Sequence, residues 1–550
     1  MRYGIDLKLA VLSAAVMLAA LFQVTLPGGA VWAQGIAAAL EARLDTEFDT
    51  PRGEVEHEEY LALRKVYEER AFAPIWVGAE GILPSGRALA DVLNNARDAG
   101  LEPDDYDVGG IAALRGSGND EGRAHLDYLL SRALLRYGSD LHSGRLNPRE
   151  VDSELFVYPR YTNPHALLAE AAATDDVTAY LAALAPDNRE YRRLKNGLSA
   201  YREIARSGGW ALLPEGETLK PGMNDPRVPL LRKRLIEIGD HAETGNGSDL
   251  FDETLEAAVK RFQYRHGLDQ DGAVGRMTTA ALNVPVEERI AQMLLNMERR
   301  RWMATDPGER YVFVNMADFI LKVVDGPKTI HDTRVVVGKP YHRTPVFSGE
   351  MTYLVLNPFW NIPPSIARRE ILPKVKENAN YLTERSIRVF SSWGGSAEEL
   401  NPSEIDWQAL SPGGFSYKLR QDPGDDNALG QIKFMFPNEF NVYLHDTPSR
   451  SLFQRTVRSF SHGCVRVQYP VDLAEVLLRD DPDWPRSKID AVLASGQRTI
   501  VRLKKSIPVH LTYLTAWVNK DGTVHFRDDI YGRDKRLREA LRLSRASVSQ

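Results

Sequence analysis

Residues 461 to 467 read Ser461-His462-Gly463-Cys464-Val465-Arg466-Val467, and nineteen positions before the cysteine lies His445, within Tyr443-Leu444-His445-Asp446-Thr447. Cys464 is the only cysteine among the 550 residues of the chain. An exported protein that relies on disulfides carries an even set of cysteines, so this thiol is free. A lone thiol between histidines and glycine favours a catalytic nucleophile over a structural cysteine.

A thiol with a pKa of about 8.5 is mostly protonated at neutral pH and needs a cationic or hydrogen-bonding neighbour to react. His445 is the best candidate for that neighbour, because it lies at the end of a predicted strand and can take a proton and return it to a leaving amine. Gly463 allows close approach of the backbone to a substrate. The amides of His462, Gly463 and Cys464 are the predicted donors of an oxyanion hole.

The group that orients His445 stays open among the Asp446 side chain, a backbone carbonyl and Ser461. Tyr443 lies two residues before His445 and is expected on the same side of its strand. Packing and a chemical role for the Tyr443 hydroxyl are equally open.

The region around these motifs has the pattern of a mainly β domain, predicted at residues 286 to 505. Short β-rich runs are broken by turns, and they occur at residues 311–314, 319–324, 334–337, 352–356, 432–436 and 442–444. The strand pattern stops between residues 363 and 430, which favours an inserted subdomain that acts as a lid. Residues 471 to 478 are predicted as a helix, and residues 506 to 550 as a β-hairpin extension around Asp521-Gly522.

Two helical regions precede the β domain, as expected of a chain long enough for about three or four domains. Residues 34 to 220 have helical periodicity, as at Leu126, Leu130 and Leu134, and are predicted to form an α-helical scaffold. Residues 221 to 285 follow a break at Lys220-Pro221-Gly222 and are predicted to form a small unit of three helices with a glycine-aspartate loop.

The N-terminus has the pattern of an export signal. Arg2 and Lys8 flank an apolar run, and Val31 and Ala33 provide the small residues of a cleavage site before Gln34. Residues 1 to 33 are therefore predicted to be a cleaved signal peptide or an uncleaved anchor, and both put the remaining chain in the periplasm. The net charge of −6, from 69 basic and 75 acidic residues, argues against binding to nucleic acid.

Two motifs resemble known families. The run Phe262-Gln263-x-x-x-Gly267-Leu268-x-x-Asp271-Gly272-x-x-Gly275-x-x-Thr278 is similar to the peptidoglycan-binding type 1 domain. His445-Asp446-Thr447 with Ser461-His462-Gly463-Cys464-Val465-Arg466 resembles the signature of the L,D-transpeptidase (YkuD-type) catalytic domain. With the further motifs Gly338-Lys339-Pro340, Thr344-Pro345 and Asn357-Pro358-Phe359-Trp360, the chain is similar to the YcbB-like subgroup.

The resemblance implies a role for each matching residue. Cys464 corresponds to the nucleophile, His445 to the general base and acid, and the backbone from His462 to Cys464 to the oxyanion hole. Arg466 corresponds to an arginine that holds a substrate carboxylate or braces the site. Tyr443 and Ser461 are the remaining candidates for substrate contact. Many relatives have glycine after the first histidine, and this chain has Asp446.

The resemblance also implies a reaction without a metal or cofactor. Cys464 attacks the carbonyl before the terminal D-alanine of a peptidoglycan tetrapeptide stem, D-alanine leaves, and the thioester passes to an amine of an acceptor stem, giving a 3→3 crosslink. Attachment of a lipoprotein, exchange of the D-amino acid and hydrolysis are the other family outcomes. Carbapenems are the implied inhibitors, and other wall-synthesis proteins are implied partners of the helical region.

Three other hypotheses compete with this one. His445, Asp446, His462 and Cys464 are ligand types that zinc accepts, but they lack the usual Cys-x-x-Cys or His-x₃₋₅-His spacing. A papain-like peptidase has its cysteine before its histidine, which is the reverse of the order here. A non-catalytic wall-binding scaffold is the third hypothesis, and the intact motif speaks against it.

Overall fold

The computed structural model describes residues 29–48, 53–242, 247–303 and 306–548, and these form two compact units. Unit 1 contains the described residues up to Gly144 together with Arg160–Pro186, and unit 2 contains Arg145–Pro159 and the described residues from Asp187 onward. The predicted export segment, residues 1 to 33, lies almost wholly outside the described residues. Among the helices described, none is both long and apolar enough to cross a membrane.

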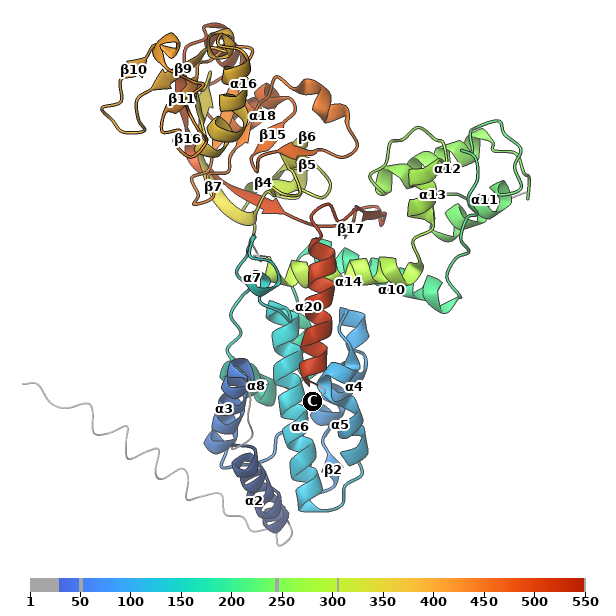
Figure 1. Cartoon of the computed structure of the whole chain (residues 1–550). Helices are drawn as coiled ribbons and strands as arrows, with labels where there is room; N and C mark the ends of the chain where they lie inside the picture. Colours follow the sequence, from blue (N-terminus) through green and yellow to red (C-terminus); the bar gives the residue numbers. More distant parts are fainter. Residues whose placement is uncertain (1–28, 49–52, 243–246, 304–305, 549–550) are drawn as a thin grey trace, which may run out of the picture. The chain divides into compact units, whose positions relative to one another are not determined.

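Unit 1 is helical, as the periodicity predicts. Its helices are α2 (Gly29–Phe48), α3 (Glu54–Glu69), α4 (Pro84–Asn94), η1 (Ala96–Ala99), η2 (Pro103–Tyr106), α5 (Val108–Leu114), α6 (Asp120–Ser143), α8 (Pro164–Ala173) and α9 (Val177–Leu184), with a small ribbon of β1 (Val77–Gly78) and β2 (Gly81–Ile82) (Figure 1). The predicted face of α6, with Leu126, Leu130 and Leu134, is buried in one core with residues of α2, α3 and α4. An amphipathic stripe therefore set the position of this helix.

A mainly β domain forms the centre of unit 2, which confirms the predicted fold class. Its strands are β3 (Leu155–Phe156), β4 (Arg310–Asn315), β5 (Ile320–Asp325), β6 (Lys328–Gly338), β7 (Val346–Leu356), β12 (Ile432–Met435), β13 (Leu444–His445), β14 (Ser459–Ser461), β15 (Val465–Val467) and β16 (Thr499–Thr512). They pair in the order β12-β13-β15-β6-β5-β4-β16-β7-β3, and β14 pairs with β6. Because β12 also pairs with β7, the sheet closes on itself as a barrel.

Alternation along the barrel strands separates a core face from an outer face. Val335 and Val337 of β6, Leu354 of β7 and Phe434 of β12 point into one apolar core. The short helices around the barrel are η5 (Arg450–Gln454), α18 (Pro470–Leu478) and α19 (Arg486–Ala494). Residues of α18 and α19 join the same core, so the predicted helix at 471–478 is confirmed.

The interruption between residues 363 and 430 is a subdomain with its own core. Strands β8 (Trp360–Ile362), β9 (Ile387–Phe390), β10 (Glu399–Leu400) and β11 (Lys418–Gln421) form a separate sheet, accompanied by α15 (Pro364–Ile366), η3 (Ala367–Ile371), α16 (Leu372–Glu377), α17 (Tyr381–Glu384) and η4 (Pro402–Glu404). Residues such as Ile362, Leu382 and Leu419 are fully buried in that core. We call residues 360 to 421 the insert; its strands and α16 lie together in Figure 1.

The module predicted at residues 221 to 285 contains α11 (Val228–Glu237), α12 (Glu253–Arg265) and α13 (Arg276–Leu282). Gln263 of α12 explains the spacing of its motif. Its side chain donates to Asp271 and to the Ala273 carbonyl, and it accepts from the Gly272 amide. One glutamine thus fixes the glycine-aspartate loop, which has the positive φ of +74° at Gly272 that glycine tolerates best.

The ends of the predicted domains differ from those in the structure. Strand β16 crosses the predicted boundary at 505 and pairs with both β4 and β7, so it completes the barrel. The predicted hairpin is present as β17 (Ala516–Val518) and β18 (Val524–Phe526), whereas α20 (Arg533–Val548), which follows it, was not predicted. The hairpin packs on α10 (Arg189–Arg206) and α14 (Val286–Trp302), where Val518 and Met293 lie against Gly197. Helix α10 therefore belongs to unit 2, although it falls inside the scaffold predicted at 34 to 220.

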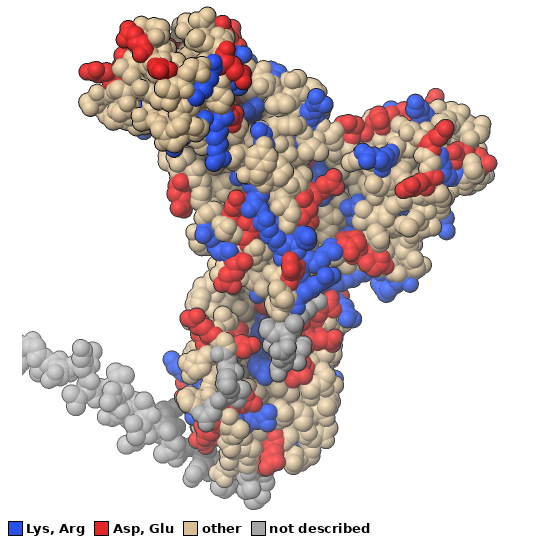
Figure 2. All heavy atoms as spheres, in the orientation of Figure 1, with Lys and Arg blue, Asp and Glu red and all other residues tan. Residues whose placement is uncertain are grey.

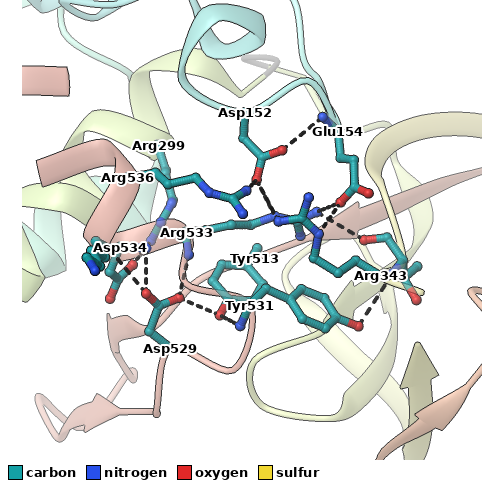
Figure 3. Close-up of polar contacts among 12 residues, drawn as sticks. Asp152, Glu154, Arg299, Arg343, Tyr513, Asp529, Tyr531, Arg533, Asp534 and Arg536 are labelled. Atoms are coloured by element: carbon teal, nitrogen blue, oxygen red, sulfur yellow. Dashed lines mark hydrogen bonds and ion pairs between the residues drawn. The ribbon is translucent and has the colours of Figure 1, made fainter. Parts of the chain in front are cut away.

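Residues 145 to 159 also belong to unit 2, because an ionic cluster holds them there. This segment contains α7 (Pro148–Val151) and β3, which pairs with β7. Asp152 lies 2.5 Å from Arg536 and 3.4 Å from both Arg533 and Arg343, as Figure 3 shows. Burial alone would raise the pKa of Asp152, but the Glu154 amide and these guanidinium groups outweigh burial and lower it. The cluster joins the segment before β3 to the start of α20.

Candidate active site

Five neighbouring strands each contribute one residue to a row on the outer face of the barrel. His445 of β13 pairs with Arg466 of β15 on one side and with Lys433 of β12 on the other. Lys433 pairs with Val355 of β7, and Val355 pairs with Ile500 of β16. Paired residues of neighbouring strands share a face, so these five side chains form one row across the sheet.

Cys464 lies just before β15, and the residue as a whole is partly exposed. Burial raises the pKa of its thiol. Two effects lower the pKa of the thiol: hydrogen bonds from the Tyr443 amide and hydroxyl, and the positive charges of Lys433 and Arg466. Together they are weaker than burial, so the pKa remains raised. The thiol is therefore protonated at neutral pH, and the groups that favour its thiolate are a tyrosine and two cations.

Among the described residues, no hydrogen bond joins the ring of His445 to the sulfur of Cys464, although the sequence predicted that neighbour. His445 is buried, and its Nδ1 lies 2.5 Å from the Asp446 carbonyl oxygen. Burial lowers the pKa of His445 to about 3, and the charge of Arg466 adds to that effect. His445 is thus a neutral ring held by a carbonyl.

The group that orients His445 is the Asp446 backbone carbonyl, one of the three left open by the sequence. The Asp446 carboxylate turns away and pairs with Arg450 at 2.8 Å. Ser461 also faces elsewhere, since its Oγ donates to the Cys464 carbonyl at 2.5 Å. Neither of these two side chains therefore orients the His445 ring in this structure.

The turn that carries the cysteine has one amide that is occupied and two that are open. The Gly463 amide donates to Ser461 Oγ at 3.1 Å, so it is directed toward that hydroxyl. Among the described residues, the amides of His462 and Cys464 have no acceptor. Gly463 has a φ of +114°, a conformation that glycine adopts without strain. The Cys464 and His462 amides are the donors available to an oxyanion at this turn.

Thr344 braces the same turn from the other side, a role that its place in the sequence motif did not predict. Its Oγ1 donates to the Gly463 carbonyl at 2.8 Å and accepts from the Gly338 amide at 3.0 Å. Tyr531 donates to the Gly338 carbonyl at 2.6 Å, and Arg533 donates to the Thr344 carbonyl at 3.2 Å. The turn at the nucleophile is thereby connected to the ionic cluster of Figure 3, in which Arg533 and Tyr531 are drawn.

Lys433 is another residue whose place in the site was not predicted from the sequence. Its Nζ lies 3.8 Å from the centroid of the Tyr443 ring, and its pKa is lowered by burial. The alternation of Ile432, Lys433 and Phe434 was the available signal, because one charged residue between two core residues must face outward. Tyr443 makes two contacts at the site: its ring packs against Lys433, and its hydroxyl hydrogen-bonds to the sulfur.

Arg466 is partly buried, and its guanidinium has no ion partner among the described residues. An unpaired guanidinium two residues after the nucleophile is suited to a carboxylate. His462, by contrast, is occupied: its Nε2 lies 2.6 Å from Oε1 of Glu370 in η3 of the insert. The insert therefore contacts the turn that carries Cys464.

Within the described part of the chain, no group of three or more His, Cys, Asp or Glu side chains is arranged to hold a metal ion. The four side chains of the zinc hypothesis point apart, since Asp446 pairs with Arg450 and His462 pairs with Glu370.

Three family models match separate parts of the chain. Residues 309–489 match the L,D-transpeptidase catalytic domain (YkuD), residues 224–282 match a "Putative peptidoglycan binding domain", and residues 61–198 match a scaffold domain. The first match encloses Cys464 and His445, and the second encloses the loop fixed by Gln263. The chain carries an L,D-transpeptidase catalytic domain and a peptidoglycan-binding domain, and domains that act on peptidoglycan work outside the cytoplasm.

A curated relative is the "Putative L,D-transpeptidase" of Haemophilus influenzae, which is 36% identical over 251 residues. The match covers 46% of this chain, and the chain spans about half (50%) of the relative's length.

Two solved structures were also similar. An L,D-transpeptidase from Xylanimonas cellulosilytica is 16% identical, covers 54% of this chain and 99% of its own, and has a TM-score of 0.18. An L,D-transpeptidase from Stackebrandtia nassauensis is 14% identical, covers 55% of this chain and 97% of its own, and has a TM-score of 0.19. Nothing about this chain follows from TM-scores this low.

Proposed function

We propose that this chain, with its L,D-transpeptidase catalytic domain, crosslinks the peptidoglycan of the cell wall. Cys464 attacks the carbonyl that precedes the terminal D-alanine of a tetrapeptide stem, and the thioester passes to an acceptor amine. One observation carries this proposal: the only thiol of the chain is partly exposed at a turn with two open amides, inside the matched catalytic domain.

In the first half of the reaction, the sulfur forms a bond to the carbonyl carbon and the thiol proton moves to a base. The oxyanion is held by the open amides of Cys464 and His462, while the Gly463 amide remains bonded to Ser461. The bond from carbon to the nitrogen of D-alanine then breaks, and that nitrogen takes the proton as D-alanine leaves. Arg466 is the proposed partner of the D-alanine carboxylate, because its guanidinium has no ion partner in the described part of the chain.

His445 is the proposed base and acid, and it must move toward the sulfur to act. Catalytic hydrogen bonds are often loose in an unliganded enzyme and tighten only when substrate binds. Burial and the charge of Arg466 lower the pKa of His445, so the ring becomes an effective base only when its movement toward the sulfur relieves that burial. Tyr443, whose hydroxyl contacts the sulfur, and Lys433 stabilise the thiolate while the proton leaves.

In the second half, the acceptor amine attacks the thioester and releases the Cys464 thiol. An amine on the third residue of another stem gives a 3→3 crosslink, and water gives an L,D-carboxypeptidase product. The insert contacts the turn through Glu370 and His462, so it is placed to exclude water and favour the amine. Attachment of a lipoprotein to the wall uses the same thioester with another amine.

We also propose where the protein works and what it meets there. Residues 1 to 33 act as a signal peptide or inner-membrane anchor, which leaves the protein in the periplasm. The module at 221 to 285 holds the enzyme on peptidoglycan, the helical scaffold meets other wall-synthesis proteins, and the domain order is that of the YcbB-like subgroup. Carbapenems acylate Cys464, because a β-lactam carbonyl can occupy the place of the stem carbonyl.

The test is to incubate purified protein with disaccharide-tetrapeptides and analyse the products by mass spectrometry. A crosslinked dimer that lacks one D-alanine is expected, and Cys464→Ala should abolish both the dimer and D-alanine release. D-alanine release without a dimer would assign the carboxypeptidase activity instead. If wild-type protein gave neither product while a known transpeptidase gave both, the chain would be a wall-binding scaffold and the proposal would be wrong.

A further inference from the structure

A basic cleft of about 430 Å³ opens on the outer face of the barrel, beside the insert. Its floor comes from β7, β12 and β16, and its wall comes from β11 and the loop before β8. Five basic side chains line it, and none of the described residues that line it is acidic. We call this pocket the cationic cleft, and its basic residues are Lys418, Arg420, Lys433, Arg498 and Arg502.

These charges are poorly neutralised by the protein. Arg420 has a distant ion partner in Asp422, at 3.9 Å. Arg498 packs instead near the ring of Phe359, 5.9 Å from its centroid. Among the described residues, no carboxylate lies within ion-pair distance of Lys433, Arg498 or Arg502. Cations gathered without counter-ions create a positive potential that attracts an anionic ligand.

The pKa of Lys433 reflects its burial and a positive charge nearby. Its pKa is lowered by burial and by the charge of Arg498, while the charge of a Cys464 thiolate has the opposite effect. The cations of the cleft therefore disfavour one another's charges, and a bound anion relieves that repulsion. Figure 2 shows a run of basic side chains near the position of β11 and β16 in Figure 1.

The cleft continues the row of residues that begins at the nucleophile. Lys433 belongs to both, since it pairs with His445 on one side and reaches Ile500 through Val355 on the other. In the adjacent row, Met435 pairs with Tyr353, which pairs with Arg502. Strands lie about 4.8 Å apart, so β15, which Cys464 precedes, lies roughly 10 Å from β12, about the length of three extended residues. A peptide bound at Cys464 can therefore reach the cleft at Lys433 of β12, and β16 with Arg502 lies about 10 Å farther in the same direction.

We propose that the cationic cleft binds the free carboxylates of the stem peptide that Cys464 attacks, so that this enzyme selects acidic stems over stems with amidated carboxylates. The inference rests on the proposed function and adds a substrate preference to it. A stem peptide carries carboxylates beyond the scissile bond, and three extended residues are long enough to bring one of them to Lys433, which lines the same cleft as the long side chains of Arg498 and Arg502. Each charge-assisted contact of this kind is lost when the carboxylate becomes a neutral amide.

The binding test uses full-length Cys464→Ala protein, in which no acyl transfer occurs. Two synthetic tetrapeptides ending in D-alanine are titrated by calorimetry, one with free carboxylates at its second and third residues and one with carboxamides there. The acidic peptide is expected to bind about tenfold more tightly or better, and Arg498→Gln/Arg502→Gln in this background should remove most of that difference. Lys505→Gln, which removes a charge from an exposed position of β16 outside the cleft, should leave it unchanged.

Equal affinity for the two peptides, or an equal loss of both in the double variant, would overturn the inference. Release of D-alanine by wild-type protein is measured in parallel with both peptides. Release without a preference for the acidic peptide sinks the cleft proposal alone. Selective binding without any release sinks the transpeptidase proposal and leaves the cleft as a carboxylate-binding site.

Discussion

The hydroxyl of Thr344 donates a hydrogen bond of 2.8 Å to the carbonyl of Gly463, the residue just before the nucleophile. That carbonyl belongs to the peptide whose amide is the open N–H of Cys464, so Thr344 fixes the direction in which this oxyanion donor points. Thr344 is fully buried and is itself held by Arg533 through its carbonyl. Residues distant in the sequence therefore position the peptide at the nucleophile.

Thr344→Val should lower kcat about tenfold with little change in KM, because a misdirected oxyanion donor affects the transition state more than the bound stem. Steady-state release of D-alanine gives both constants, and Thr344→Ser should restore kcat. Thr512→Val is the matched control, since it removes another buried threonine hydroxyl that donates to a barrel carbonyl, that of Val314. An equal loss in both valine variants would point to general destabilisation instead.

Lys433→Met should raise the pKa of the Cys464 thiol further above its usual value, because a positive charge that favours the thiolate is lost. At a given pH below that pKa the thiolate fraction falls, and alkylation by iodoacetamide slows accordingly. The rate is read over a range of pH, and Cys464 is the only site that can react. Lys322→Met, at another partly buried strand position of the barrel, should leave the profile unchanged. An unchanged profile for Lys433→Met would contradict the assigned role.

His445 should remain neutral to about pH 4, because burial lowers its pKa to about 3. An NMR titration of histidine-labelled protein can follow it, with His445→Gln to assign the signal. The folded protein binds fewer protons at His445 than the unfolded chain does. The contribution of His445 to the free energy of unfolding is therefore fully present above pH 6.5 and is lost progressively as the pH falls toward 3. Arg466→Gln should raise the pKa of His445, whereas the exposed Arg479→Gln should not. A His445 titration near pH 6.5 would disprove the assignment.

Glu370→Gln should loosen the insert over the nucleophile, because the contact of 2.6 Å between Glu370 and His462 loses its charge. Hydrogen exchange of the insert should increase, and the proportion of hydrolysed to crosslinked product should rise as water enters. Glu384→Gln, which alters a surface contact with Asn378 inside the insert, is the control. An unchanged product ratio with faster exchange would separate the lid from the choice of acceptor.

Asp152→Asn should destabilise unit 2 by about 3 kcal/mol, because Arg343, Arg536 and the buried Arg533 lose the carboxylate that they share, and Arg533 keeps only Glu154 as an ion partner. Thermal unfolding followed by near-UV circular dichroism measures the effect as a fall in Tm. Asp187→Asn, which removes an exposed ion pair with Arg192, should cost less than about 1 kcal/mol. Similar Tm values for both variants would show that the cluster of Figure 3 contributes little.

The parts of the fold that the sequence predicted were those with a local signal. The helical face of α6, the strands around β6 and β7, and the hairpin at Asp521-Gly522 were all readable, because periodicity and turn residues act over a few neighbouring positions. Helix α20 was missed, since its many charged residues mask the short apolar stripe of Leu537 and Leu541, which packs on the barrel core. Strand β16 was cut at its middle because its charged outer positions conceal a strand that two neighbours hold in place.

By itself, the sequence predicted Cys464 as the nucleophile, because a single cysteine within a Ser-His-Gly-Cys motif requires no spatial information. The partners of that cysteine were decided only by the tertiary structure, which puts Tyr443 and Lys433 near the sulfur and turns His445 toward the Asp446 carbonyl. The physical reason is that hydrogen bonds and charges act over a few ångströms. Which residues come within that range depends on how β12, β13 and β15 pair, and strand pairing joins residues that the chain keeps apart.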